Sequence, residues 1–402
     1  MQCAIVGGGA AGLFAACALA RGGAKVFVLE RQPRVGKKLL ATGGGRCNLI
    51  NLRAEPARYH GARDFASPIL AAYPPARIIR AFEDMGVPVY ADAEGRGYPA
   101  SNLASSVLDA LRLTLREAGG VELTGFDAMQ IENTQGGYLV RARDGREQAC
   151  EKLLIASGGR AAPKLGGCVE GYALLRALGH DVTPLLPVIA PLKTHTEPIR
   201  GLKGQRARCV ITLYDGNSPV QTERGEALFT EYGLSGICAM QLARAVHAAK
   251  KPVVSIDFAP DAQHAMIENR ARMLPNRPLE DFLNGVVSRR VGWAIARMAG
   301  IADLACPAGT LSPIEINALE GALRAFRLPV IGVCGFESAQ TTAGGADMRE
   351  FHPSTLESRK RPGLYVAGEV CDVDGDCGGY NLGWAWASAL AAAHAMLKVR
   401  MI

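Results

Sequence analysis

The chain begins with an alternation of apolar and glycine-rich segments. Residues 3–6 (CAIV) form a short apolar run, residues 7–12 (GGGAAG) are glycine-rich, and small apolar residues continue to about Ala20. A second apolar run, residues 25–29 (KVFVL), ends at Glu30. This order predicts a buried strand, a tight turn, a helix and a parallel strand, which together make the first unit of a doubly wound α/β domain.

Further along the chain, hydrophobic periodicity predicts both helices and strands. Helices are expected at residues 104–118, 237–249, 266–272, 279–287, 294–298 and 381–397. Strands are expected at residues 120–131, 138–143, 152–156, 208–214, 253–258 and 364–367. The pair around Gly136 and Gly137 reads as a β-meander, whereas residues 215–217 (DGN) read as a turn.

The pattern changes near residue 190, where prolines and strand-like stretches replace the α/β alternation. We therefore expect an inserted domain at residues 190–330, between the two parts of a cofactor-binding domain at residues 1–189 and 331–402. The inserted segment holds 17 Lys and Arg against 13 Asp and Glu, a net charge of +4 out of +7 for the chain. Such a balance suits a solvated face or a polyanionic partner.

Composition narrows the class of protein. The 402 residues are 49% hydrophobic and 21% charged, which excludes collagen, coiled coil and disorder. The longest apolar stretch, residues 382–397, is shorter than the ~20 residues of a membrane span. Eleven cysteines are spread singly without a Cys-x-x-Cys pair, and no metal-ligand spacing occurs. These features predict a cytoplasmic protein with no membrane association.

The first glycine-rich segment has the spacing of a dinucleotide fingerprint. Gly7 permits the tight turn, Gly9 lets a pyrophosphate approach the backbone, and Gly12 lets the helix pack closely on the strand. Glu30 follows at about the distance expected for the acid that binds ribose hydroxyls. The candidate phosphate and ribose residues are Gly7, Gly9, Ala10, Ala11, Gly12 and Glu30.

A second glycine-rich loop favours FAD over NAD. It can lay backbone N–H groups along an extended cofactor, and the nearby Arg31 and Lys38 can offset phosphate charge. The loop residues are Gly43, Gly44, Gly45, Arg46, Cys47 and Asn48. Because the chain has no second Gly-x-Gly-x-x-Gly, NAD(P)H would bind only transiently as electron donor.

The C-terminal segment places a second set of glycines next to a helix. A short strand ends at Gly368 and Glu369, and Gly378 and Gly379 precede the last apolar helix. The positive end of that helix would stabilise the pyrimidine side of a reduced flavin. The candidate flavin residues here are Gly368, Glu369, Asp376, Gly378, Gly379, Tyr380, Asn381 and Leu382.

These motifs resemble those of the YhiN-like family of bacterial flavoproteins, also called the BaiN/RdsA family. The matches include residues 43–48 (GGGRCN), 155–159 (IASGG), 229–236 (FTEYGLSG), 364–369 (LYVAGE) and 372–382 (DVDGDCGGYNL). The resemblance implies an FAD-dependent oxidoreductase in which a split Rossmann-type domain carries an inserted domain of β-barrel and helices. It also implies cofactor contacts by Ser157, Gly158 and the backbone at Ala128.

Several residues are candidates for chemistry. Cys47, with its pKa lowered by Arg46 in open surroundings, could donate a proton to substrate; the alternative is that it packs against the cofactor. Thr230, Tyr232 and Ser235 are candidate substrate contacts, or alternatively parts of a turn. His60, His195, His352 and Tyr98 are isolated and are expected to be structural.

Three functional hypotheses follow. The first is a reductase that passes hydride from flavin N5 to a conjugated double bond of a small molecule. The second, also associated with the family that the chain resembles, is a reductase of uridine in ribosomal RNA. The third is a flavin sensor without turnover. The sequence leaves the substrate, the electron donor and the oligomeric state open.

Overall fold

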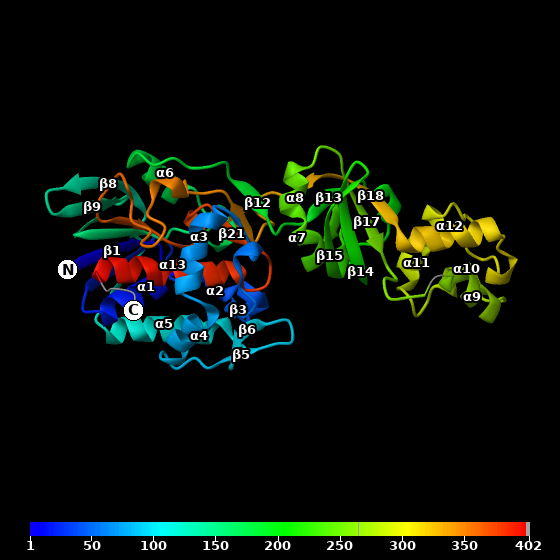
Figure 1. The fold of residues 1–402 in the computed structure, drawn as a ribbon, viewed down its shortest axis with the longest axis horizontal. Helices are drawn as coiled ribbons and strands as arrows, with labels where there is room; N and C mark the ends of the chain where they lie inside the picture. The colour runs from blue at the N-terminus through cyan, green and yellow to red at the C-terminus, as the bar shows by residue number, and fades with distance from the viewer. Residues whose placement is uncertain (264, 399–402) are drawn as a thin grey trace. The chain divides into compact units, whose positions relative to one another are not determined.

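The computed structural model describes residues 1–263 and 265–398 and divides into two compact units (Figure 1). Unit 1 consists of Met1–Leu186 together with the chain from Gln340 onward, and unit 2 is Pro187–Ala339. The expected end of the inserted domain at residue 330 falls inside a strand of unit 2, β18 (Phe326–Val333). Each unit has its own sheet system and is described separately.

Unit 1 is built on a parallel five-stranded sheet with the order β20-β11-β1-β2-β7. Its strands are β1 (Gln2–Val6), β2 (Lys25–Glu30), β7 (Val121–Thr124), β11 (Lys152–Ile155) and β20 (Leu364–Val366). Neighbouring strands pair in parallel throughout. The Rossmann-type sheet predicted from the sequence is thereby confirmed, because the last predicted strand pairs beside β11 as its edge.

Two apolar helices from opposite ends of the chain pack together in unit 1, α1 (Ala10–Arg21) and α13 (Tyr380–Leu397) (Figure 1). Phe14 of α1 contacts the Trp386 ring of α13 at a centroid distance of 5.1 Å. The remaining α-helices are α2 (Lys37–Leu40), α3 (Arg63–Ala72), α4 (Pro75–Glu83), α5 (Ala104–Glu117) and α6 (Glu170–Ala177). The predicted helices at residues 104–118 and 381–397 are confirmed.

Small antiparallel sheets complete unit 1. The strand predicted at residues 120–131 is two strands, β7 in the parallel sheet and β8 (Ala128–Thr134), and β8 forms the meander with β9 (Gly137–Ala142) and β10 (Glu147–Cys150). The others are β3 (Ile50–Asn51), β5 (Val89–Ala91) and β6 (Arg96–Pro99) in one sheet, and β4 (Tyr59–Gly61) with β21 (Val373–Gly375) in another. Two further short strands are β12 (Leu186–Val188), which spans the boundary between the units, and β19 (Thr341–Ala343) of unit 1.

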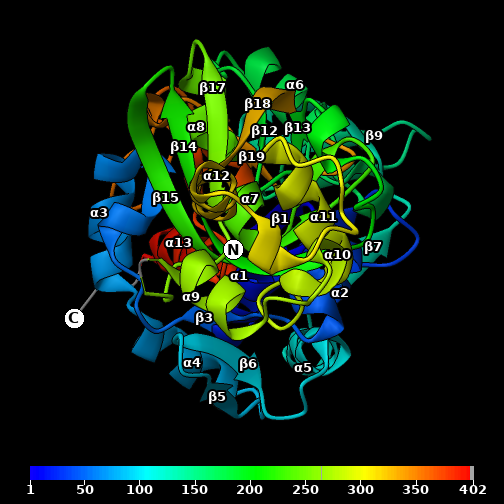
Figure 2. The same cartoon turned by 90° about the vertical axis from the view of Figure 1, so that its right-hand side faces the viewer.

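Unit 2 contains a closed barrel with the strand order β13-β16-β15-β14-β17-β18. Its strands besides β18 are β13 (Leu192–Thr194), β14 (Arg206–Asp215), β15 (Ser218–Phe229), β16 (Gly233–Ser235) and β17 (Pro252–Asp257). Figure 2 shows β14, β15 and β17 side by side. Asp215 pairs with Ser218, so the predicted turn at residues 215–217 is a hairpin. Alternate residues of β14, among them Cys209 and Ile211, are buried inside the barrel.

The helices of unit 2 differ in places from the sequence prediction. They are α7 (Ile237–Gln241), α8 (Ala243–Ala248), α9 (Met266–Met273), α10 (Leu279–Phe282), α11 (Arg289–Met298) and α12 (Pro313–Arg324). The single helix expected at residues 237–249 is two helices, and the one expected at 279–287 ends at Phe282, before Gly285 adopts a positive φ of 91°.

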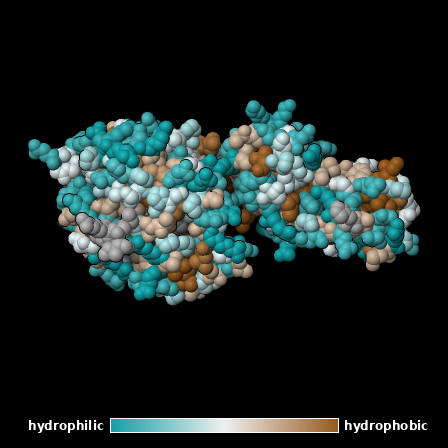
Figure 3. Space-filling view, viewed as in Figure 1, coloured by the Kyte–Doolittle hydropathy of each residue, from teal (hydrophilic) through white to brown (hydrophobic). Residues whose placement is uncertain are grey.

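Helix α12 of unit 2 was not predicted from the sequence, although the sequence contains the capping box that marks its N-terminus. Helix α12 begins with a capping box in which Ser312 accepts a hydrogen bond from the Glu315 backbone and Glu315 reaches back to Ser312. Met273 of α9 and Ile314 of α12 are exposed apolar residues on these helices. Figure 3 shows hydrophobic residues, in brown, at the surface of unit 2. No helix within the described residues is long and apolar enough to cross a membrane.

Candidate functional site

The first glycine loop has the geometry of a phosphate cradle. A Cβ on Gly7 would lie 2.4 Å from the Ala156 carbonyl oxygen, and one on Gly12 would lie 1.9 Å from the Gly7 oxygen. Both positions therefore require glycine, as the fingerprint predicts. Gly9 faces open space, and α1 begins there without a side-chain cap. The first N–H groups of α1 are thus available to an anion.

The carboxylate of Glu30 is held at the edge of this cradle. Its Oε2 accepts a hydrogen bond from Gly8 N at 2.8 Å, and its Oε1 accepts one from Gln32 N at 2.7 Å. A carboxylate oxygen has a second lone pair, so Glu30 can still accept from ribose hydroxyls. The backbone of Glu30 also accepts from Phe126 N, which brings β8 and Ala128 to the same edge.

The structure gives Arg31 and Lys38 protein partners that the sequence did not reveal. The Lys38 ammonium lies 2.7 Å from Glu369 Oε2, while Glu369 Oε1 accepts from Thr342 N at 3.0 Å. Arg31 lies 3.6 Å from Glu170 Oε2 and donates to the Gly166 carbonyl. Both positive charges thus already have a carboxylate neighbour within the protein, and the expectation that they also offset phosphate charge stays a prediction.

The second glycine loop presents its backbone to open space. Gly43, Gly44 and Gly45 all adopt positive φ angles, and a Cβ on Gly44 or Gly45 would meet no atom within 4 Å. Arg46 Nε donates to the Gly43 carbonyl at 3.2 Å. Its guanidinium lies over the Tyr98 ring, 4.8 Å from the ring centroid. Tyr98, which is isolated in the sequence, thus packs against the second glycine loop.

Cys47 contradicts the expectation of an open, reactive thiol. Its side chain is fully buried, and this burial raises the thiol pKa to about 11. The residue adopts a φ of 60°, so the chain turns there and directs the sulfur into the core while Arg46 stays exposed. Cys47 is therefore a neutral thiol at pH 7, and its burial supports the alternative that its side chain packs within the protein.

Two asparagines join the second glycine loop to the C-terminal loop. The Asn48 side-chain oxygen accepts from Gly379 N at 3.2 Å, and its nitrogen donates to the Ile50 carbonyl at 3.2 Å. Asn51 Nδ2 donates to the Gly378 carbonyl at 2.8 Å. Segments more than 300 residues apart in sequence thus share one face of unit 1, and sequence reasoning missed Asn51 because an isolated amide carries no motif.

The C-terminal loop is braced by its own side chains. Asp376 Oδ1 lies 2.9 Å from His60 Nε2, and Asn381 exchanges two hydrogen bonds with the Gly375 backbone. The Tyr380 ring packs edge-on against Tyr59, and Leu382 is half-buried. The side chains of Asp376, Tyr380 and Asn381 shape the loop, which leaves backbone N–H groups at Gly378 and α13 as the groups to meet a ligand.

A third connection ties these loops to the fingerprint helix. A Cβ on Gly368 would lie 2.8 Å from Ala11 Cβ of α1. Gly368 N donates to Ser388 Oγ at 2.9 Å, and its carbonyl accepts from Trp384 Nε1 at 3.1 Å. Gly158 faces open space on the adjoining loop, where the buried Ser157 Oγ has no hydrogen-bond partner in the described structure. These open glycine backbones and the orphaned hydroxyl fit an extended dinucleotide such as FAD.

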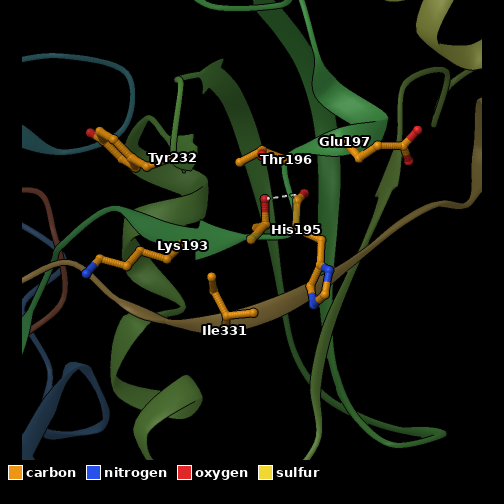
Figure 4. A pocket seen from close by; sticks show the side chains of 7 residues that line it. Lys193, His195, Thr196, Glu197, Tyr232 and Ile331 are labelled. Carbon is orange, nitrogen blue, oxygen red and sulfur yellow. Dashed lines mark hydrogen bonds between the residues drawn. The ribbon is translucent and has the colours of Figure 1, made fainter.

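The three predicted substrate residues all lie in unit 2, and one of them, Tyr232, lines a pocket there. Thr230 Oγ1 donates to the Gly233 carbonyl at 3.0 Å, and Ser235 Oγ lies 3.6 Å from Met240 Sδ, so both hydroxyls serve the turn. Tyr232 lines an open pocket of about 430 Å³ (Figure 4). The other lining residues are Lys193, Thr194, His195, Thr196, Glu197 and Ile331.

Comparison with known proteins identifies relatives along nearly the whole chain. A 3-dehydro-bile acid delta(4,6)-reductase of Clostridium scindens is 34% identical over 97% of this chain and 98% of its own length. A ribosomal RNA dihydrouridine synthase of Escherichia coli is 30% identical over 98% of each chain. Among solved structures, 3-ketosteroid delta1-dehydrogenase from Sterolibacterium denitrificans superposes with a TM-score of 0.54 at 12% identity over 99% of both chains, a likeness of fold alone.

The parallel sheet, the glycine loops and these relatives define the class as a Rossmann-fold flavoprotein oxidoreductase. Within that class the family model described as "HI0933-like protein Rossmann domain" matches residues 1–395. The chain belongs to this family. The resemblance inferred from the motifs is confirmed, as is the combination of a Rossmann-type domain with a barrel and helices.

Proposed function

We propose that this chain is an FAD-dependent reductase that acts on a conjugated carbon–carbon double bond of a small molecule, with NAD(P)H as electron donor. The observation that carries the proposal is the junction of the two glycine loops by Asn48 and Asn51 beside the fingerprint helix. The names of the two relatives support it, because both describe reduction of a double bond conjugated with a carbonyl group.

When bound, FAD supplies a hydride from its reduced ring to an electron-poor carbon. In this assignment the residues from Gly7 to Gly12 and the first turn of α1 hold its pyrophosphate. Glu30 would accept hydrogen bonds from the ribose hydroxyls, and the backbone at Ala128 would contact the adenine. Residues 43–48 and 368–382, with Ser157 and Gly158, surround the remainder of the cofactor.

The chain's own residues then prepare the site for reduction. The N-terminal amides of α13, which follow Gly379, place positive partial charge at the C-terminal loop and favour an anionic neighbour. Exposed Arg46, held over Tyr98, is assigned to orient the substrate. Proton donation by Cys47 stays a hypothesis, which the burial of its thiol disfavours. A Cys47→Ala variant that keeps its flavin and full turnover would reject that last role.

The first experiment is an anaerobic absorbance spectrum of the purified protein before and after addition of NADH or NADPH. A bound flavin that bleaches within the mixing time and reoxidises on addition of a cyclic enone supports the proposal. A protein that holds no flavin refutes the cofactor assignment. A flavin that stays oxidised with both nicotinamides refutes the assigned donor.

Reduction of uridine in ribosomal RNA is the second candidate function. It is favoured by two relatives named ribosomal RNA dihydrouridine synthase, from Escherichia coli and Haemophilus influenzae, and by the net charge of +4 at residues 190–330. Filter binding to ribosomal RNA across a range of salt, followed by detection of dihydrouridine, tests it. Failure to bind at low salt removes this candidate. None of the eleven cysteines forms a disulfide in the described structure, which suits a reducing cytoplasm for either function.

A further inference from the structure

Two buried cysteines of unit 2 lie side by side, one on a barrel strand and the other on a helix. Cys209 belongs to β14 and Cys238 to α7, which packs against β14 and β15 (Figure 1). Cys209 pairs directly with Gly225 of β15, so side chains at these two positions point to the same face of the barrel wall. A Cβ on Gly225 would lie 3.3 Å from Cys238 Cβ and 3.7 Å from its Sγ. Because Gly225 has no side chain, Cys238 occupies the place beside Cys209.

A hydrogen bond between the two thiols makes them chemically unequal. The Cys209 thiol donates to the Cys238 sulfur, which lowers the pKa of Cys238 below its ordinary value and raises the pKa of Cys209. The Cys238 sulfur also accepts a hydrogen bond from the backbone N–H of Ala239. Burial has the opposite effect at Cys3, where it raises the thiol pKa to about 11. Cys238 is therefore the member of the pair that more readily forms the nucleophilic thiolate.

We propose that Cys209 and Cys238 form a reversible oxidation site, at which hydrogen peroxide converts the two thiols into a disulfide. Adjacent thiols of this kind in a reducing compartment are typical of transient, redox-sensing disulfides. The inference goes beyond the proposed function and involves unit 2 alone.

The oxidation proceeds in two balanced steps. The Cys238 sulfur attacks one peroxide oxygen, so that an S–O bond forms, the O–O bond breaks, and hydroxide leaves as water with the Cys238 proton. The Cys209 sulfur then attacks the Cys238 sulfur, so that the S–S bond forms, the S–O bond breaks, and a second water leaves with the Cys209 proton. The two thiols together lose two electrons, and peroxide is reduced to water.

The surroundings of Cys238 suit a small oxidant. Its side chain is 1% exposed, whereas the preceding Ile237 is 56% exposed, so the thiol lies one residue below the surface. Helix α7 has five residues and no side-chain cap. A helix this short is not stable by itself, and it can open locally to admit a molecule as small as peroxide. When α7 closes again, the two sulfurs need only a short approach to reach the ~2.05 Å of a disulfide bond.

The test is peptide mass spectrometry of the native protein, as purified with its cofactor, after exposure to hydrogen peroxide. Trypsin separates the two thiols, because Cys209 lies in the peptide 209–224 and Cys238 in the peptide 225–244. We expect peroxide to join these peptides, with the loss of one hydrogen atom from each thiol, and dithiothreitol to separate them again. Cys306, a partly exposed cysteine of unit 2, should be oxidised about tenfold more slowly, because desolvation raises its pKa.

Single variants separate the roles of the two thiols. Cys209→Ala removes the second thiol, so Cys238 should stop at the sulfenic acid and be labelled by dimedone. Cys238→Ala removes the attacking thiolate, so Cys209 should stay reduced. Cys306→Ala is the matched control and should leave the joining of the two peptides unchanged. Circular dichroism of each variant verifies that it is folded, and the wild-type result does not depend on any variant.

The inference is overturned if peroxide leaves the two peptides of the wild-type protein separate, or joins them only after a denaturant has unfolded it. Labelling of Cys209 in Cys238→Ala as fast as labelling of Cys238 in Cys209→Ala would refute Cys238 as the thiol that peroxide oxidises first. Both readouts are made without turnover, so they hold or fail independently of the reaction assigned to the flavin site.

Discussion

Ser388 of α13 provides a sharp test of how the loop at Gly368 is held. Its hydroxyl is fully buried, accepts a hydrogen bond from Gly368 N at 2.9 Å and donates to the Trp384 carbonyl at 2.6 Å. Ser388→Ala removes the acceptor and leaves the Gly368 N–H without its partner. The same loop carries Glu369 and lies against α1 at Ala11.

The expected cost follows from this geometry. A buried N–H group that loses its acceptor costs about 1–3 kcal/mol, which is roughly a 5- to 150-fold change in the local opening equilibrium. The lost donation to Trp384 adds little, since that carbonyl lies inside α13, where helical hydrogen bonding continues. Because the ordered loop is part of the assigned FAD site, the affinity for FAD falls in proportion to the fraction of molecules whose loop is closed, so its loss is at most this factor and smaller while the closed loop still predominates.

Hydrogen exchange read by mass spectrometry on peptides that contain residues 364–371 measures the first effect, and titration of apoprotein with FAD measures the second. Ser105→Ala, on an exposed turn of α5, is the matched control and should change neither quantity. Unchanged protection of the Gly368 peptide in Ser388→Ala would refute the argument that this hydrogen bond holds the loop. FAD binding that does not restore protection of the Gly368 peptide in Ser388→Ala would show that the loop does not contribute to cofactor binding.

Three further predictions follow from the geometry of unit 1. Burial lowers the pKa of His180, so the folded state resists protonation of this side chain. The contribution of neutral His180 to the free energy of unfolding should be complete above pH ~6.5 and should be lost as the pH falls through the lower folded pKa. His180→Gln should abolish this part of the dependence of the melting temperature on pH. Cys47, buried and with its pKa raised to about 11, should resist iodoacetamide at pH 8 while the partly exposed Cys377 is labelled, as peptide mass spectrometry can establish; rapid labelling of Cys47 in the native protein would contradict its burial. Gly12→Ala should yield protein without flavin because its Cβ would lie 1.9 Å from the Gly7 oxygen, whereas Gly321→Ala, in open space on α12, should keep full flavin content; a flavin-replete Gly12→Ala protein would exclude the fingerprint as the phosphate site.

Local patterns in the sequence were sufficient to predict secondary-structure elements and the class of protein. The strand–glycine–helix order at the N-terminus predicted β1, α1 and β2, because backbone requirements such as those at Gly7 and Gly12 are met within a few residues. Helix α12 could also have been predicted, because its capping box is a local sequence signal. The long strand β15 was not assigned, because alternating polar residues gave it no continuous apolar run.

Side-chain partners were decided by the tertiary structure alone. Lys38 meets Glu369, and His60 meets Asp376, across more than 300 residues, so no spacing in the sequence could indicate either pair. The open surroundings expected for Cys47 became a buried position because one positive φ turned its side chain inward.

The sequence by itself therefore determined the Rossmann-type unit, the family and the backbone glycines of the candidate FAD site. Those features depend on the conformational requirements of single residues and on hydrophobic periodicity, and both are determined by residues that are close together in the sequence. The tertiary structure decided which charges are already paired, which thiol is buried, and that Cys209 and Cys238 lie side by side. Those properties depend on distances between strands and helices that only the folded packing establishes.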